Sequence, residues 1–256
     1  MTTTPDELSA TLFAAMALVF LLAGVVKGVV GLGLPTLAMA LLALLMSPAR
    51  AAALLIVPSL VTNLWQLRPW ASLGRMARRL WPLQFGICTG TLAGAWVLGA
   101  PSSSWAMAAL GAMLIVYALW ALSGARLSIA QDMETELGLP MGAMTGLIAA
   151  VTGVFTVPAV PYLQALSLNR DELIQAMGIS FTVSTVALGL SLFLNGHYSS
   201  ADASASALML LPALLGMSVG RSLRHRLSPL VFRRCFLGGL VALGLHMIIQ
   251  QAASMR

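Results

Sequence analysis

Charge is scarce in this sequence. Asp, Glu, Lys and Arg together make up 9% of its 256 residues, 59% are hydrophobic, and the mean hydropathy is +0.92. About a quarter of the residues in a soluble globular domain are charged, so this composition excludes a soluble globule. The chain is long enough for many membrane spans of about 20 residues each, with little left outside the bilayer.

Carboxylates are missing from the middle of every apolar run. The acidic residues lie near the N-terminus, in a polar central segment or at expected helix starts: Asp6, Glu7, Asp132, Glu134, Glu136, Asp171, Glu172 and Asp202. A cation or metal permease, or a pump with an intramembrane proton relay, normally needs an acidic side chain within a span. The pattern argues against such a carrier and leaves uniport, anion exchange, or coupling through His246 or Asp171.

Cysteines and enzyme motifs are also scarce. Cys88 lies in an apolar run and Cys235 beside a basic segment, so we expect neither a disulfide framework nor a Cys-x-x-Cys site. The sequence has no Gly-x-Ser-x-Gly elbow, no His–Glu metal box and no buried acid–base pair. We therefore expect no enzymatic activity, no metal site and no cofactor. A polytopic membrane enzyme such as a lipid phosphatase, or a cation or metal permease, stays an alternative.

The most informative pattern is a motif that occurs twice. Pro82-x-x-x-Gly86-x-x-x-Gly90 recurs as Pro212-x-x-x-Gly216-x-x-x-Gly220, and each copy has arginines at one end. They precede the first copy (Arg68, Arg75, Arg78, Arg79) and follow the second (Arg221, Arg224, Arg226, Arg233, Arg234). Because cytoplasmic loops accumulate Lys and Arg, the two related helices should cross the bilayer in opposite directions. This is the pattern of an inverted repeat, an architecture found in transporters.

The net charge follows from the same two arginine segments. They hold nine of the fourteen basic residues, and the formal net charge is +6. We interpret this charge as a determinant of membrane orientation and expect no nucleic-acid partner. Both termini should lie outside, with the segments 68–79, 125–136 and 221–234 in the cytoplasm. The N-terminal segment has no positive n-region and no cleavage site, so we expect an uncleaved first span.

The fold expected from these patterns is an all-α polytopic membrane protein built from two inverted halves. Residues 1–124 form the first repeat, 125–137 a cytoplasmic linker and 138–256 the second repeat. Apolar runs predict five helical elements in each half, at 8–30, 34–46, 49–67, 80–100 and 103–123, then 139–151, 154–166, 173–194, 205–223 and 230–249. An odd number of elements per half inverts the second half. Each second element would span only about 20 Å, short of the roughly 30 Å hydrocarbon core.

A helix-breaking stretch precedes each short element. Gly31 and Gly33 precede the first, while Gly153, Pro158 and Pro161 mark the second. We infer that the first two elements of each half form a broken pair whose unwound backbone lines a cavity. The alternative is that these residues mark kinks or tight helix packing.

These features resemble the TauE/SafE sulfite-exporter family of bacterial and archaeal permeases. The resemblance covers nearly the whole chain and includes the broken pairs, the repeated motif, Gly196-x-x-x-x-x-Asp202 and the tail GRSLRHRLSPLVFRRCFLGGL. It implies export of sulfite or transport of an organosulfonate across the inner (plasma) membrane, by alternating access around a site between the repeats. The family usually has two or three consecutive glycines in each break, whereas this chain has separated ones, so the identity of the anion stays open.

The intramembrane polar residues suggest where the anion binds. Lys27, the only lysine, lies in an apolar run just before the first break, and an ionisable group there predicts a functional site. Its alternative is snorkelling to the surface. Amide donors would complement the charge, although interhelical hydrogen bonding explains them equally well. The predicted site contains Lys27, Gly31, Gly33, Asn63 and Gln66 from the first half and Gly153, Gln164 and Thr182 from the second. The expected partners are a small anion and the lipid bilayer, and a homo-oligomer is left open.

Overall fold

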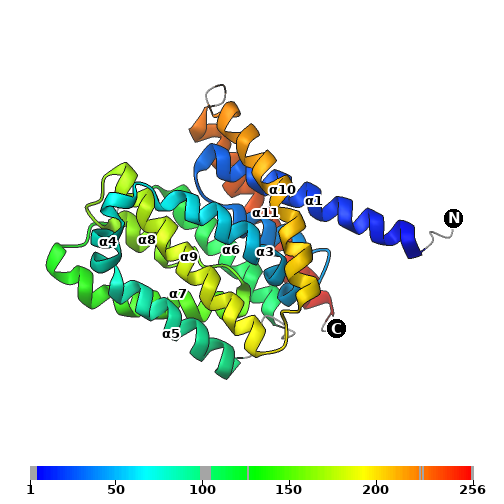
Figure 1. Ribbon diagram of the computed structural model, residues 1–256, viewed down its shortest axis with the longest axis horizontal. Coiled ribbons are helices and arrows are strands. Elements are labelled where there is room, and N and C mark those ends of the chain that lie inside the picture. The colour runs from blue at the N-terminus through cyan, green and yellow to red at the C-terminus, as the bar shows by residue number, and fades with distance from the viewer. Residues whose placement is uncertain (1–4, 99–104, 126, 225, 227, 255–256) are drawn as a thin grey trace.

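The computed structural model describes residues 5–98, 105–125, 127–224, 226 and 228–254, and all regular structure within these ranges is helical (Figure 1). The α-helices are α1 (Pro5–Val30), α2 (Leu34–Leu42), α3 (Pro48–Leu64), α4 (Trp70–Arg79), α5 (Trp81–Leu98), α6 (Ala106–Ser123), α7 (Glu134–Thr152), α8 (Ala159–Ala165), α9 (Arg170–Leu194), α10 (Ser200–Leu223) and α11 (Pro229–Ser254). Two short 3-10 helices, η1 (Trp65–Leu67) and η2 (Gln131–Met133), follow α3 and precede α7.

Every one of the ten expected elements contains a helix. Six helices in the described part of the chain are long and apolar enough to cross a membrane, by length and composition: Ala10–Val30, Pro48–Leu67, Ala106–Ser123, Arg170–Leu194, Ser200–Leu223 and Leu230–Ala253. The helices α5 and α7 also form where long elements were expected but are not among these six. The prediction of an all-helical membrane protein is therefore confirmed.

Several helix boundaries differ from the sequence prediction, and three of the differences bear on the breaks and the linker. The short element α2 ends at Leu42, and α8 begins only at Ala159, so the second break extends to Pro158. Proline at that position has no backbone N–H and disfavours helix in the residue before it, which delays the start of α8. Helix α7 begins at Glu134, within the segment expected to form the linker. Residues 103 and 104, expected to begin the fifth element, lie outside the described residues.

The sequence prediction missed one helix entirely. The segment 68–79 was expected to be a loop, but residues Trp70–Arg79 form α4 at the left of Figure 1. Its buried Met76 packs with Leu80 and Leu83 in a hydrophobic cluster, while Arg75 and Arg78 are exposed. This is an amphipathic helix, and the dense arginines hid its apolar face from a search for apolar runs.

Two helix pairs approach each other closely because they meet at glycines. A Cβ added at Gly90 of α5 would lie 2.2 Å from the carbonyl oxygen of Ala143 in α7, and one at Gly220 of α10 would lie 2.2 Å from that of Val25 in α1. The facing helices contribute glycines at the same spacing, Gly142 and Gly146 in α7 and Gly24 and Gly28 in α1. Small residues at a helix interface let backbones touch. The repeated motif therefore forms two close crossings, α5 with α7 and α10 with α1.

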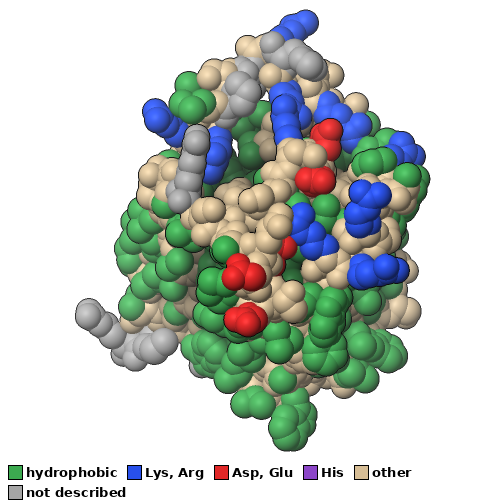
Figure 2. Space-filling model, turned by 90° about the vertical axis from the view of Figure 1, so that its left-hand side faces the viewer, with side chains coloured by type: hydrophobic (Ala, Val, Ile, Leu, Met, Phe, Trp, Pro, Cys, Tyr) green, Lys and Arg blue, Asp and Glu red, His purple; other side chains and the backbone are tan. Residues whose placement is uncertain are grey.

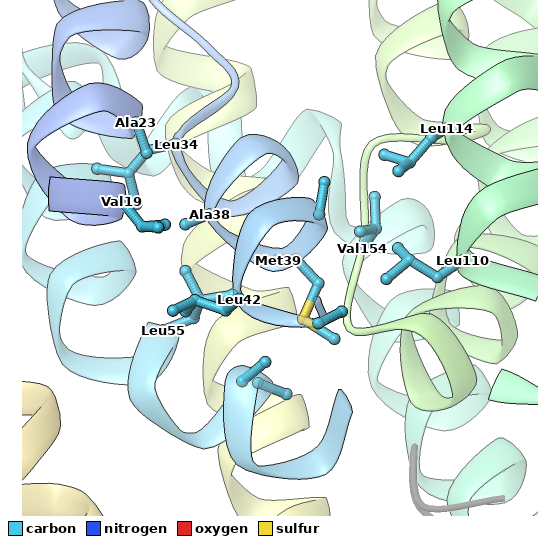
Figure 3. Packing of buried hydrophobic residues seen from close by; sticks show 14 of the residues in the cluster. Val19, Ala23, Leu34, Ala38, Met39, Leu42, Leu55, Leu110, Leu114 and Val154 are labelled. Carbon is cyan, nitrogen blue, oxygen red and sulfur yellow. The ribbon is translucent and has the colours of Figure 1, made fainter. Parts of the chain in front are cut away.

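The two broken pairs meet in the core. Figure 3 shows Met39 of α2 beside Val154 of the segment that follows α7. A Cβ added at Gly153 would lie 3.0 Å from the Met39 sulfur, so the second break also packs against α2. Around them lie further buried residues of α1, α3 and α6, among them Val19, Ala23, Leu55, Leu110 and Leu114. The short helix of one half is thus seated against the unwound backbone of the other.

A polar contact ties α4, α7 and α8 together on the left side of Figure 1. The Arg79 guanidinium makes a bidentate ion pair with the Glu134 carboxylate, with Nη2–Oε1 and Nε–Oε2 distances of 2.6 and 2.9 Å. The Tyr162 hydroxyl donates to the Glu134 backbone carbonyl at 2.6 Å. The hydrogen bond to Glu134 raises the pKa of Arg79 above its ordinary value, so the guanidinium stays protonated.

Candidate functional site

Lys27 is buried between α1 and α3. Its side chain is 4% exposed, and Nζ donates to Oγ1 of Thr62 at 3.0 Å and to Oδ1 of Asn63 at 2.5 Å. Both acceptors are neutral and both are buried. The alternative of a lysine that snorkels to the surface does not match this geometry, because the amine points into helix α3 and is closed off from solvent.

Helix α3 is shaped by a proline to hold these acceptors. Pro58 has no N–H, so the carbonyl of Leu54 loses its helical partner, and the Ser206 hydroxyl of α10 donates to it at 2.8 Å. Ser206 also accepts from the N–H of Val57 at 3.0 Å. One turn later, the Thr62 hydroxyl donates to the Pro58 carbonyl at 2.7 Å, which directs its lone pairs towards Lys27.

The cluster leaves hydrogen-bond donors unused. An ammonium has three N–H donors, and Lys27 has two acceptors in the described part of the protein. The Asn63 amide nitrogen is fully buried and has no partner among the described residues. An unmet buried donor costs about 1–3 kcal/mol, so two such donors side by side indicate a binding site for an acceptor. These two donors can bind an oxyanion.

The first break lies directly beside this cluster. Gly31 has a φ of 89°, and nothing lies within 4 Å of the position where a side chain would begin. Its carbonyl accepts from Nε2 of Gln66 at 2.8 Å, while the Gln66 oxygen is buried and has no partner among the residues that the structure describes. Gly33 has a φ of 100° and starts α2. Both conformations favour glycine, and so the unwound backbone depends on these two residues.

Two of the predicted residues line a common cavity. Gly31 from the first half and Gln164 from α8 both face a cavity of about 270 Å³. Its wall also includes Val29, Val30 and Leu32 of the first break, Tyr117, Trp120 and Ala121 of α6, and Leu173, Ile174 and Met177 of α9. The expectation that unwound backbone lines a cavity is therefore met at the first break. Lys27 lies one helical turn before Gly31, whose N–H donates to the Lys27 carbonyl.

The second half contributes less to this cluster than the sequence suggested. Gly153 packs against Met39 and Ala52, and the Thr182 hydroxyl donates to the Gly178 carbonyl of its own helix at 2.7 Å. Gly178 lets α9 approach Gln66, since a Cβ there would lie 2.9 Å from the Gln66 Cβ. The structure thus brings Lys27, Gly31, Asn63 and Gln66 together, and places Gly153 and Thr182 elsewhere along the interface of the two halves.

Charges near the site are of one sign. In the described part of the chain the buried charged side chains are Lys27 and Glu134, and Glu134 is paired with Arg79. Within the same residues no three His, Cys, Asp or Glu side chains are grouped so that they could hold a metal ion. His246 and Asp171, considered above for coupling, are both exposed.

Sequence reasoning missed part of the cavity wall. Arg170, Arg224 and Arg233 line it, although the arginines were considered only as markers of orientation. A signal was present in the position of Arg170, a basic residue at the start of a helix, where the helix dipole is unfavourable to it.

The chain matches the family model described as "Sulfite exporter TauE/SafE" over residues 16–247, from α1 to near the end of α11. No curated protein and no solved structure matches it. The family is one of membrane transporters rather than enzymes, in agreement with the six helices suited to crossing a membrane. This multi-pass membrane protein therefore belongs to the TauE/SafE sulfite exporter family.

Proposed function

We propose that this protein transports sulfite or a small organosulfonate across the plasma membrane, by alternating access around a site between two inverted repeats. The observation that carries the proposal is the buried Lys27, hydrogen-bonded to the neutral Thr62 and Asn63 beside an unpartnered amide donor. A buried ammonium without a counterion is costly. An anion arriving from solution supplies the missing charge.

The packing supports the two-repeat arrangement. In the proposed repeat, α1, α2, α3, α5 and α6 of the first half correspond in that order to α7, α8, α9, α10 and α11 of the second half. Exchanging the two halves then converts the crossing of α5 with α7 into the crossing of α10 with α1. Glycines spaced by four residues make both crossings. The pairs α3 with α9 and α6 with α11 map onto themselves, and both are in contact. This exchange pattern is expected of a pseudo-two-fold axis.

The distribution of charge supports the proposed orientation. Figure 2 shows Lys and Arg side chains gathered on the face at the left of Figure 1. The arginines of both basic segments lie in or just before α4, and between the end of α10 and the start of α11. By the excess of Lys and Arg in cytoplasmic loops, this face is cytoplasmic. The cavity beside Gly31 is lined by Arg224 and Arg233 of the second basic segment and is then reached from the cytoplasm.

The chemistry of the site favours an anion over the other substrates considered. A charge-assisted hydrogen bond from Lys27 is roughly twice as strong as a neutral one, and the Asn63 amide adds a second donor to an oxyanion. A cation would meet an ammonium and a free N–H donor instead of carboxylates. Sulfite and sulfonates both present three oxygens, and sulfite is the anion that the family description names.

Flux measurements with pure protein in liposomes test the proposal. We expect saturable uptake of sulfite or methanesulfonate, competition between the two, and no loss of rate when a metal chelator is present. Protein-free liposomes serve as the control for leak. Saturable transport of a divalent metal ion that anions do not inhibit would show that the proposal is wrong.

A further inference from the structure

Three arginines from three different elements converge on the cavity beside the first break. Arg170 is the first residue of α9, Arg224 is the C-terminal cap of α10 and Arg233 lies in α11. The cavity volume of about 270 Å³ is just below the range of pockets for drug-sized ligands, which begins at roughly 300 Å³. The space therefore suits a small ligand.

Within the described residues, the arginines of this cavity form no ion pair. No carboxylate is among the described residues that line it. Asp171, next to Arg170 in sequence, lines a separate hollow with Arg68, and Glu172 accepts from the Asn169 backbone in the cap of α9. Among the described residues, the hydrogen-bond partner of Arg233 is neutral, the Ala121 carbonyl at 3.3 Å. The ion pair found in the described ranges, Arg79–Glu134, lies elsewhere.

The position of Arg170 is unfavourable for its helix. The N-terminal end of a helix carries a partial positive charge and favours acidic residues. Asn169 and Glu172 complete the cap of α9 without any contribution from Arg170. A residue that breaks a local rule without a local gain marks a functional position, and Arg170 faces the cavity.

We infer that this cavity is an anion vestibule, in which Arg170, Arg224 and Arg233 bind the transported oxyanion before it reaches Lys27. The inference rests on the proposed function. Guanidinium groups match the oxygens of sulfonate and sulfite through paired N–H donors. The floor of the vestibule is the backbone at Gly31, one turn from Lys27, and Gln164 adds an amide from the opposite half.

Such a vestibule affects the binding of the anion from solution more than the rate of the later transport step. A concave surface of one charge raises the local concentration of a counterion and its rate of arrival, and salt screens the effect. Loss of one arginine should therefore raise KM and weaken the dependence of KM on ionic strength. The maximal rate should change little, because the anion at saturating concentration still reaches Lys27.

Transport kinetics with matched arginine variants test this inference. Arg170→Gln and Arg233→Gln remove a cavity charge, and Arg226→Gln removes the same charge outside the cavity, two residues after Arg224. In neutral phosphatidylcholine vesicles, we expect the two cavity variants to raise KM for methanesulfonate about tenfold, with the control near wild type. If KM and its salt dependence are unchanged while Lys27→Met abolishes transport, the vestibule is wrong and the proposed function stands.

Tryptophan fluorescence gives a direct measure of binding. Trp120 lines the cavity, whereas Trp96 is 87% exposed on α5. Titration with methanesulfonate should change the fluorescence of wild type and of Trp96→Phe in a saturable way, and much less that of Trp120→Phe or Arg170→Gln. Melting temperatures of all variants identify any that are misfolded. An equal fluorescence change in Trp120→Phe and wild type would contradict binding in this cavity.

An anionic lipid headgroup presents the same chemistry as the substrate. The kinetic comparison is therefore repeated in vesicles that contain phosphatidylglycerol. If the cavity variants differ from wild type only in these vesicles, the arginines bind lipid, and the substrate vestibule is overturned. A KM effect of the same size in neutral vesicles supports the inference.

Discussion

Nζ of Lys27 lies 2.5 Å from Oδ1 of Asn63, a residue 36 positions away on another helix. The partner is an amide, so it accepts a hydrogen bond without cancelling the charge. The Asn63 amide nitrogen has no partner in the described part of the protein. In the proposed function, this pair is a preorganised receptor and the substrate supplies the negative charge that it lacks.

Removal of the lysine charge should weaken anion binding. Lys27→Met keeps the length and apolar stem but deletes the ammonium. We expect a loss of about 1.5–3 kcal/mol, which is about tenfold or more in affinity, measured by calorimetric titration with sulfite. Lys27→Arg should retain part of the affinity, since its charge stays while its shape changes. An unchanged affinity in Lys27→Met would remove Lys27 from the site.

A carboxylate introduced next to Lys27 should replace the anionic substrate as its counterion. Asn63→Asp changes little in shape but places a carboxylate against Lys27, and the resulting ion pair no longer needs an anion. We expect sulfite affinity to fall about tenfold or more, with a melting temperature no lower than that of wild type. The matched control is Gln84→Glu, because Gln84 donates to Ser180 and has no contact with Lys27 among its hydrogen bonds. Equal losses of sulfite affinity in both variants would show that any nearby carboxylate lowers the affinity and that its contact with Lys27 is irrelevant.

The equivalent glycines of the two crossings should respond alike. Gly90→Ala and Gly220→Ala each place a methyl group 2.2 Å from a facing carbonyl oxygen, so the helices must move apart. Overpacking of this kind typically costs about 1–3 kcal/mol. The comparison is Gly238→Ala in α11, where nothing lies within 4 Å. Thermal unfolding in detergent should show a lower midpoint than wild type for Gly90→Ala and Gly220→Ala, and an unchanged midpoint for Gly238→Ala. A similar midpoint in all three variants would contradict the close crossings.

The orientation can be tested by labelling single cysteines. In a background without Cys88 and Cys235, cysteines placed at Ser103 and at Arg226 should react with an impermeant thiol reagent from opposite sides of the membrane. Ser103 lies outside the described residues, and its expected position follows from the lack of Lys and Arg in its loop. Labelling of both from the same side would remove the inverted repeat from the proposal.

Much of this fold could be read from the sequence because the bilayer imposes simple rules. Runs of apolar residues predict spans, and each of the ten expected elements contains a helix. Helix α4 was not predicted because arginines interrupt its apolar residues along the sequence. Its packing beside Leu80 and Leu83 in the folded protein decides that it forms a helix. The breaks were visible as glycines and prolines, but their extent depended on contacts across the two halves, such as Gly153 on Met39.

The sequence by itself determined the class of protein, ten of its helical elements and the repeated glycine motif, and it predicted a role for an isolated lysine, since composition and spacing reflect local physics. Only the tertiary structure decided what the lysine touches. Hydrogen bonds reach about 3 Å and depend on direction, so the pairing of Lys27 with Thr62 and Asn63 requires the packing of α1 on α3. The same packing brought Gly31, Gln164 and three arginines from distant segments around one cavity, which no spacing along the chain could indicate.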